Sequence, residues 1–127
     1  MKESEQFRKG IALFNAREYF EAHEVWEELW LVEPEPEKTF LQGLIQVAAA
    51  CHHNSRGNAS GTQSLLAAGL AKLRSFPDDH RGIALAKLRT DAEEWAAAPG
   101  VADDPGAGRP PRIRLSARAS PKKKRGG

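Results

Sequence analysis

Residues 21–30, "EAHEVWEELW", carry side chains suited to acid–base or metal chemistry within one short stretch. His23 and Glu27 are one helical turn apart, so both project from the same side of a helix. The pattern His-Glu-x-x-Glu is similar to the zinc-protease pattern His-Glu-x-x-His, with Glu27 in place of the second histidine. In this interpretation His23 and Glu27 bind a divalent metal, and Glu24 acts as general base on a metal-bound water.

The surroundings of this pair decide what it can do. A helical projection places His23 in the middle of an apolar face and Glu27 beside it; the apolar residues of this face are Tyr19, Phe20, Trp26, Trp30 and Leu31. A buried carboxylate is costly unless it is paired, metal-bound or protonated. Two interpretations follow. Glu27 accepts a structural hydrogen bond from His23, a tryptophan or an arginine, or the pair belongs to a metal or acid–base site.

A second stretch, residues 37–55, adds a polar stripe to a largely apolar helix. Gln42, Gln46 and His53 share one side of it, whereas His52 projects with the apolar residues. If the stripe faces the first stretch, the two form one inward cluster, and His53 becomes a third metal ligand. Glutamine both donates and accepts hydrogen bonds, which favours a network or a small polar ligand over a bare metal site. The alternative is a stripe that faces solvent. The expected cluster comprises His23, Glu27, Gln42, Gln46 and His53.

Helical periodicity runs along most of the chain and is interrupted only by turn signals. Two prolines within residues 33–36 disfavour helical geometry, a glycine within 56–58 suits a left-handed helix end, and residues 77–79 combine proline with two aspartates. The sequence therefore predicts an all-α fold, a single bundle of about five helices joined by short connections. The expected helices are residues 3–15, 18–31, 37–55, 60–76 and 79–98.

Two long motifs, "FNAREYFEAHEVWEELW" and "FLQGLIQVAAACHHNSRGNASG", resemble the small helical family catalogued as domain of unknown function 309. The resemblance covers about residues 14–73 and implies an all-helical fold with no established activity. The chain departs from the pattern at Arg17, where members often have Gly, and at Thr62, where they often have Ala. The pattern falls on Asn15, Tyr19, Glu21, His23, Glu24, Trp26, Glu27, Trp30, Gln42, Gly43, Gln46, His53, Arg56, Gly57, Asn58 and Gly61.

The resemblance adds Arg56 and Asn58 as binding candidates. Arg56 neutralises Glu24 or Glu27, or else holds an anionic ligand. Asn58 is expected to cap the helix that follows it.

Charge divides the chain into two parts. Residues 1–98 carry 11 Lys and Arg against 15 Asp and Glu, a net charge of −4, whereas residues 99–127 carry 8 against 2, a net charge of +6. The second part is rich in Pro, Gly, Arg and Lys and has little to bury, so we expect a helical domain over 1–98 and a disordered basic tail over 99–127. Its end, "SPKKKRGG", is similar to a nuclear-localisation signal, and residues 109–125 suit weak, non-specific contact with nucleic acid.

The sequence also favours a compartment. The single Cys51 excludes an intramolecular disulfide, and the first ten residues begin with charges and lack an apolar signal core. The longest stretch without charged residues, 39–55, is too short to span a bilayer. We therefore expect a cytoplasmic protein with no membrane segment.

Three functional hypotheses follow from these patterns. The first is a binding or assembly module, including a homodimer or a site for an unidentified small polar ligand. The second is a divalent-metal-dependent hydrolase that uses His23, Glu27 and His53 as ligands and Glu24 as base. The third is a nucleic-acid accessory protein that acts through its basic tail. The sequence does not identify a reaction, a ligand or a metal.

Overall fold

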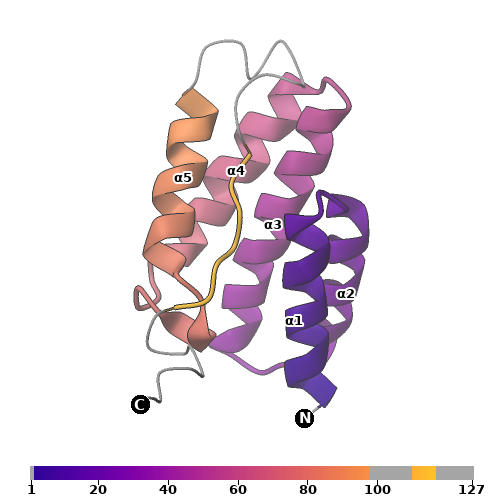
Figure 1. Cartoon of the computed structure of the whole chain (residues 1–127), viewed down its shortest axis with the longest axis vertical. Coiled ribbons are helices and arrows are strands. Elements are labelled where there is room, and N and C mark those ends of the chain that lie inside the picture. Colours follow the sequence, from indigo (N-terminus) through magenta and orange to yellow (C-terminus); the bar gives the residue numbers. More distant parts are fainter. Residues whose placement is uncertain (1, 98–109, 117–127) are drawn as a thin grey trace, which may run out of the picture.

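The computed structural model describes residues 2–97 and 110–116, and these residues form a helical bundle (Figure 1). The predicted all-α fold is confirmed. The described ranges contain no strand, and their only β-type pairing is an isolated bridge between Ile83 and Leu115. The elements are α1 (Lys2–Asn15), α2 (Tyr19–Val32), α3 (Glu37–Ser55), α4 (Ala59–Leu73), a 3-10 turn (His80–Gly82) and α5 (Leu85–Ala97).

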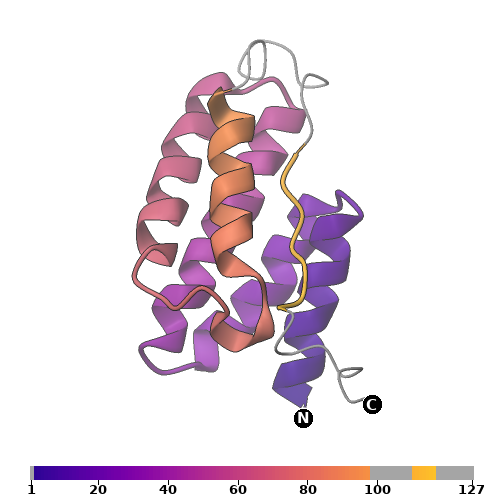
Figure 2. The same ribbon diagram turned by 60° about the vertical axis from the view of Figure 1, so that its left-hand side comes forward.

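The helices follow one another up and down, and each packs against the next along the chain (Figures 1 and 2). Two glycines bring α3 and α4 close together. A Cβ atom added to Gly69 would lie only 2.8 Å from the backbone oxygen of Gly43. The missing side chains therefore let the two backbones come together along the centre of the bundle.

The core gathers around Trp26 of α2, whose side chain is fully buried. Its indole Nε1 donates a hydrogen bond of 3.2 Å to the backbone oxygen of Phe7. The rings of Phe7 and Phe14 lie 6.4 Å and 6.1 Å from the Trp26 ring, centroid to centroid. The aromatic side chains of α1 and α2 thus form one continuous apolar unit with a satisfied polar atom inside it.

The last helix begins later than the sequence predicted, at Leu85 and not at residue 79. Arg81 and Gly82 have φ angles of 57° and 81°, and these left-handed residues interrupt the helical path. The helix then begins where the backbone oxygen of Asp78 accepts hydrogen bonds from the N–H groups of Leu85 and Ala86, at 2.8 Å and 3.2 Å. A backbone carbonyl thus binds two of the amides that a helix start leaves unpaired.

Residues 110–116, here called the C-terminal segment, run between α1 and α5 in both views (Figures 1 and 2). Ile113 is 3% exposed and belongs to the core. The expectation of a disordered tail from residue 99 onward is therefore wrong for this segment, because one aliphatic side chain and several backbone hydrogen bonds hold it in place. The remaining tail residues, 99–109 and 117–127, lie outside the described ranges.

Cys51 lies on the apolar side of α3 and is 2% exposed. Burial raises the pKa of its thiol far above the usual value, because a thiolate there would lack solvation. The residue packs as a small apolar side chain. In the part of the chain that the structure describes, no helix has both the length and the apolar character needed to cross a bilayer.

Candidate functional site

Phe20 projects from the first turn of α2 and remains 48% exposed. Its ring lies close to two imidazoles. The centroid of His23, also on α2, is 5.9 Å away with the rings stacked, and that of His52, on α3, is 5.6 Å away. An exposed aromatic ring is thereby held in one orientation by neighbours from two helices.

His52 and His53 extend this arrangement along the end of α3, with their ring centroids 6.2 Å apart. The pKa of His52 is lowered below 6.5, first by desolvation and then by the positive potential of Arg56, His53 and His23, while Glu21 opposes the shift. His52 is therefore uncharged near neutral pH and offers a hydrogen-bonding ring without a net charge. We call this set the Phe20 patch: Phe20, His23, His52, His53 and Arg56.

His53 is fixed by Asn58, the residue that precedes α4. Asn58 Oδ1 accepts a hydrogen bond of 2.9 Å from the N–H of Gly61, which confirms the predicted helix cap. That bond orients the amide, so Nδ2 points at His53 Nδ1, 2.9 Å away. Because an amide nitrogen only donates, His53 Nδ1 accepts and the ring proton of the neutral form lies on Nε2. Gly61 leaves room for the ring, since an added Cβ would lie 3.1 Å from His53 Cγ.

The expected pairing of His23 with Glu27 is present at the surface. His23 Nε2 lies 3.5 Å from Glu27 Oε2, and the two side chains are 26% and 51% exposed. The expectation that Glu27 points into the core is therefore wrong. His23 Nδ1, in contrast, is buried and has no hydrogen-bond partner among the described residues.

The error arose from the apolar residues that defined the predicted face of α2. The helical projection places Phe20 and Leu31 on the buried face, but they are 48% and 68% exposed. The residues that α2 buries are centred roughly 80° away from His23 around the helix axis, so His23 lies at the edge and Glu27 beyond it. The buried residues of this helix are Tyr19, Ala22, Trp26 and Leu29.

The polar stripe of α3 faces α4 and not α2. The Cβ of Gln46 lies 3.1 Å from the position that a Cβ of Gly69 would take, and His53 lies against Gly61. Gln46 Oε1 is buried without a hydrogen-bond partner in the described ranges, and Gln42 is half-buried on the same stripe. His52, which the projection places among the apolar residues of α3, lies against Phe20 of α2. The predicted inward cluster is therefore not formed, because Gln46 packs against α4 whereas His23 and Glu27 pair at the surface of α2.

The predicted metal site is not assembled. Within residues 2–97 and 110–116, no three His, Cys, Asp or Glu side chains converge in a way that could hold a metal ion. His23, Glu27 and His53 therefore do not fit the divalent metal of the hydrolase hypothesis, and Glu24, which is exposed, has no assembled site to serve as base. Arg56 is exposed as well, and its effect in this structure is on His52.

A second polar group, which the sequence did not reveal, ties the 3-10 turn to α3. His80 Nε2 lies 2.8 Å from Glu37 Oε2, and Arg81 Nη1 lies 3.3 Å from Glu37 Oε1. Arg81 also reaches Glu33, with Nη2 3.5 Å from Oε2, and stacks over the ring of Phe7 at 4.6 Å. These side chains are at most 30% exposed. No short sequence motif contains this group, because Glu37 and His80 are 43 positions apart in the chain.

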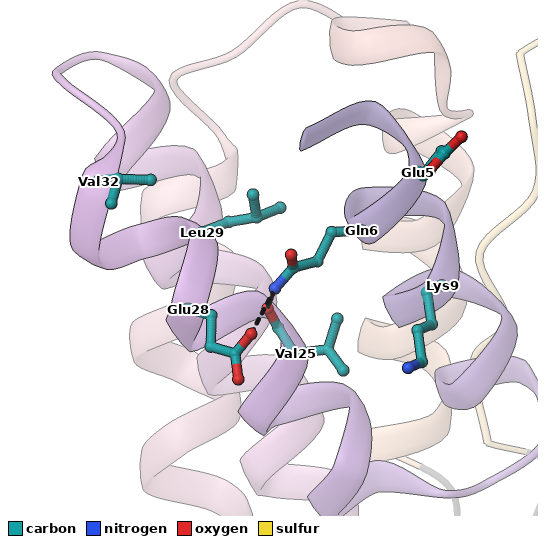
Figure 3. A pocket seen from close by; sticks show the side chains of 7 residues that line it. All are labelled: Glu5, Gln6, Lys9, Val25, Glu28, Leu29 and Val32. Carbon is teal, nitrogen blue, oxygen red and sulfur yellow. Dashed lines mark hydrogen bonds between the residues drawn. The ribbon is translucent and has the colours of Figure 1, made fainter. Parts of the chain in front are cut away.

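A shallow hollow of about 540 Å³ lies between α1 and α2 (Figure 3). Val25, Leu29 and Val32 supply apolar walls, and charged residues of both helices line its rim. Gln6 crosses the hollow, since its Nε2 donates to the backbone oxygen of Val25 and to Glu28 Oε1, both at 2.9 Å. None of the candidate residues from the sequence lines this hollow.

The fold and the Phe20 patch define a small all-α bundle with an exposed aromatic and imidazole surface. Residues 7–65 match the family described as Domain of unknown function (DUF309). This match covers a little under half of the chain and contains both motifs that indicated it. The matched range includes α2, α3 and the start of α4, and therefore the whole Phe20 patch. It ends before α5 and the C-terminal segment.

Two curated relatives are similar to the chain. An uncharacterized protein of Aquifex aeolicus is 32% identical over 94 residues, which are 73% of this chain and 28% of the relative. The uncharacterized protein YpuF of Bacillus subtilis is 37% identical over 68 residues, or 53% of this chain and 37% of the relative. The chain thus spans about a third of the length of the curated relatives it matches.

Proposed function

We propose that this protein is a small binding and assembly module whose contact surface is the Phe20 patch. The observation that carries the proposal is the ring of Phe20, which is 48% exposed yet contacts the imidazoles of His23 and His52. Aromatic side chains, phenylalanine among them, and arginine are enriched at the core of protein interfaces. A ring that is already fixed loses little conformational entropy when a partner covers it.

The polar atoms of the patch support the same role. His23 Nδ1 is buried without a hydrogen-bond partner among the described residues, and His52 is held uncharged by its surroundings. The neutral imidazole of His52 is desolvated at lower cost than a charged group would be, so a partner can cover it and still gain hydrogen bonds. The patch therefore combines an apolar anchor with adaptable polar atoms.

The comparisons support a modular role in a further way. The segment that this chain shares with its relatives makes up 28% and 37% of their lengths. A sequence that occurs in chains of such different length is typical of a domain that folds independently. Such a domain can supply the same binding surface to each of these chains. The activity of the longer proteins is not transferred to this chain.

The partner that we propose is a second copy of the chain. A twofold dimer places the same surface on both sides, so the two Phe20 rings would meet near the axis. The rim suits such self-association, because Arg56 and Glu21 carry opposite charges and both lie close enough to His52 to shift its pKa. Each copy would thus offer a cation and an anion to the other.

Light scattering from micromolar to millimolar concentration tests this proposal. We expect the wild-type protein to associate and the Phe20→Ser variant to remain monomeric. Leu31→Ser is the matched control, because Leu31 is 68% exposed at the other end of the same helix and should leave association unchanged. A wild-type protein that stays monomeric throughout, or a Phe20→Ser variant that associates equally well, would contradict the proposed dimer.

Nucleic-acid contact through residues 109–125 remains a second proposal. Arg112 and Arg114 are exposed on either side of the buried Ile113, so the described part of this range directs its cations outward. Contact with phosphates would be electrostatic and would weaken steeply with salt. Retention on immobilised DNA at two salt concentrations tests it. Deletion of residues 117–127, combined with Arg112→Ser and Arg114→Ser, should abolish the retention at low salt.

A further inference from the structure

The C-terminal segment runs between α1 on one side and α5 with the chain that precedes it on the other (Figure 2), and we call the surface that it covers the groove. Four backbone hydrogen bonds hold it. Asn15 Nδ2 donates to the backbone oxygen of Ile113 and Asn15 Oδ1 accepts from the N–H of Ile113, both at 2.8 Å. The N–H of Ala84 donates to the oxygen of Arg114 at 2.7 Å, and the N–H of Ser116 donates to the oxygen of Gly82 at 2.9 Å.

These contacts recognise an extended backbone more than a particular sequence. The side-chain amide of Asn15 pairs with both backbone groups of one residue, as a neighbouring strand would. On the other wall, the bridge between Ile83 and Leu115 continues the same pattern. Adding a strand to exposed backbone groups is a recurrent way in which domains bind peptides.

Side chains add selectivity to this backbone recognition. Ile113 is 3% exposed and enters the core, whereas Arg112 and Arg114 on either side of it point to the surface. Both arginines line a hollow with Glu94 of α5 and with Asp91, whose Oδ1 lies 3.2 Å from Lys87 Nζ. The groove therefore suits an aliphatic residue between two cations.

The family match includes part of the groove but not the segment that occupies it. Asn15 lies within residues 7–65, which match the family, and the C-terminal segment lies outside that range. Residues 98–109 separate the segment from the end of α5. One wall of the groove thus belongs to the shared domain, while the peptide that fills it belongs to the part of this chain beyond the match.

We propose that the groove is a peptide-binding site for an extended Arg-aliphatic-Arg segment, and that residues 110–116 occupy it as a built-in, displaceable ligand. A tethered ligand competes strongly with a free one, because its effective concentration is high. A partner carrying a segment of this chemistry binds only when the chain's own segment leaves. Occupancy of the groove would therefore control access by such a partner.

A labelled synthetic peptide of residues 108–118 tests the proposal by fluorescence polarisation with the full-length chain. The Ile113→Asp variant of the protein should empty the groove and bind the wild-type peptide at least about tenfold more tightly than the wild-type protein does. A peptide with the same Ile113→Asp change should not bind. Adding Asn15→Ala to the Ile113→Asp protein should remove the binding. If the Ile113→Asp protein is folded by circular dichroism and still does not bind the peptide, the proposal is wrong.

Hydrogen exchange of the wild-type protein keeps the proposal testable if the Ile113→Asp chain does not fold. The amides of Ile113 and Ser116 should exchange through local release, faster than the buried amides of α3 but slower than free peptide. Exchange of these amides only at the slow rate of α3 would show that the segment never leaves, and would overturn the proposal. If the protein forms a dimer that excess peptide dissociates, the segment of one copy occupies the groove of the other. That result would also support recognition of the segment by the groove.

Discussion

Asn15 and Ile113 exchange two hydrogen bonds of 2.8 Å although they are 98 positions apart in the chain. One side-chain amide thereby satisfies both backbone groups of a residue whose own side chain is buried. The pair joins the end of α1 to the C-terminal segment, and it connects the family domain to the part of the chain beyond it.

Replacing Asn15 by Ala should lower the free energy of unfolding by about 1–3 kcal/mol, because two hydrogen bonds are lost and the backbone groups of Ile113 are left unpaired in a partly buried place. Chemical denaturation measures the change. Gln63→Ala, an exposed position of α4, is the control and should have little effect. Equal stability of Asn15→Ala and wild type would mean that the two bonds contribute nothing.

Arg17→Gly should stabilise the protein by about 1 kcal/mol, because a residue with a Cβ is strained in left-handed geometry and glycine is not. Arg17 has a φ of 66°, at the position where the family pattern often has Gly. The comparison is Arg8→Gly, an exposed site within α1, which should instead destabilise by about 1 kcal/mol. A fall in melting temperature for both variants would contradict this account of Arg17.

Glu37→Gln should destabilise the protein by about 1–3 kcal/mol, since His80 and Arg81 both lose a charged acceptor in a partly buried place. The matched control is Glu93→Gln. Glu93 pairs with Arg74, but their side chains are 49% and 57% exposed, so that change should cost less than about 1 kcal/mol. Thermal melting of the two variants provides the comparison. Equal losses of stability would show that the partly buried pairs of Glu37 stabilise the fold no more than the exposed pair of Glu93 and Arg74 does.

Stability should fall as the pH decreases below about 6.5, the ordinary value for histidine. The pKa of His52 is lowered in the folded protein, so over the range just below 6.5 the unfolded chain binds more protons than the folded one. The free energy of unfolding therefore rises with pH across this range. Denaturation at a series of pH values should show the slope, and His52→Gln should reduce it.

Arg56 is the charged neighbour that contributes most to this shift after desolvation. In Arg56→Gln, the NMR titration midpoint of His52 should therefore move up toward 6.5. Arg74→Gln is the control, because Arg74 pairs with Glu93 elsewhere. An unchanged midpoint in Arg56→Gln would mean that burial alone lowers the pKa.

Local signals in the sequence predicted the helices better than their contacts. The bounds of α3, residues 37–55, agree with the prediction because Pro36 precedes the helix and Gly57, with a φ of 76°, follows it. The late start of α5 was missed, since it depends on Arg81, whose left-handed geometry goes with contacts to Glu37 of α3 and Phe7 of α1. Ile113 was missed for the same reason, because its burial depends on Asn15 and on the chain around Ile83.

The candidate residues were found more readily than their arrangement. The motifs selected His23, His53, Arg56 and Asn58, which do lie at one end of the bundle. The helical projection could not tell which neighbour each side of α3 would face, and it therefore joined Gln46 to Glu27. Treating Phe20 as a core residue shifted the predicted buried face of α2 around the helix axis. The exposure of this ring is, however, the main feature of the Phe20 patch.

The burial of Cys51 gives the protein an internal reporter of its own opening. The chain has one sulfhydryl group, it lies on the packed side of the central helix, and a reagent that attacks thiolates cannot reach it in the closed bundle. The speed of alkylation under native conditions therefore counts how often α3 separates from its neighbours. This measurement needs no engineered label, and it reports opening at the centre of the bundle separately from events at its surface.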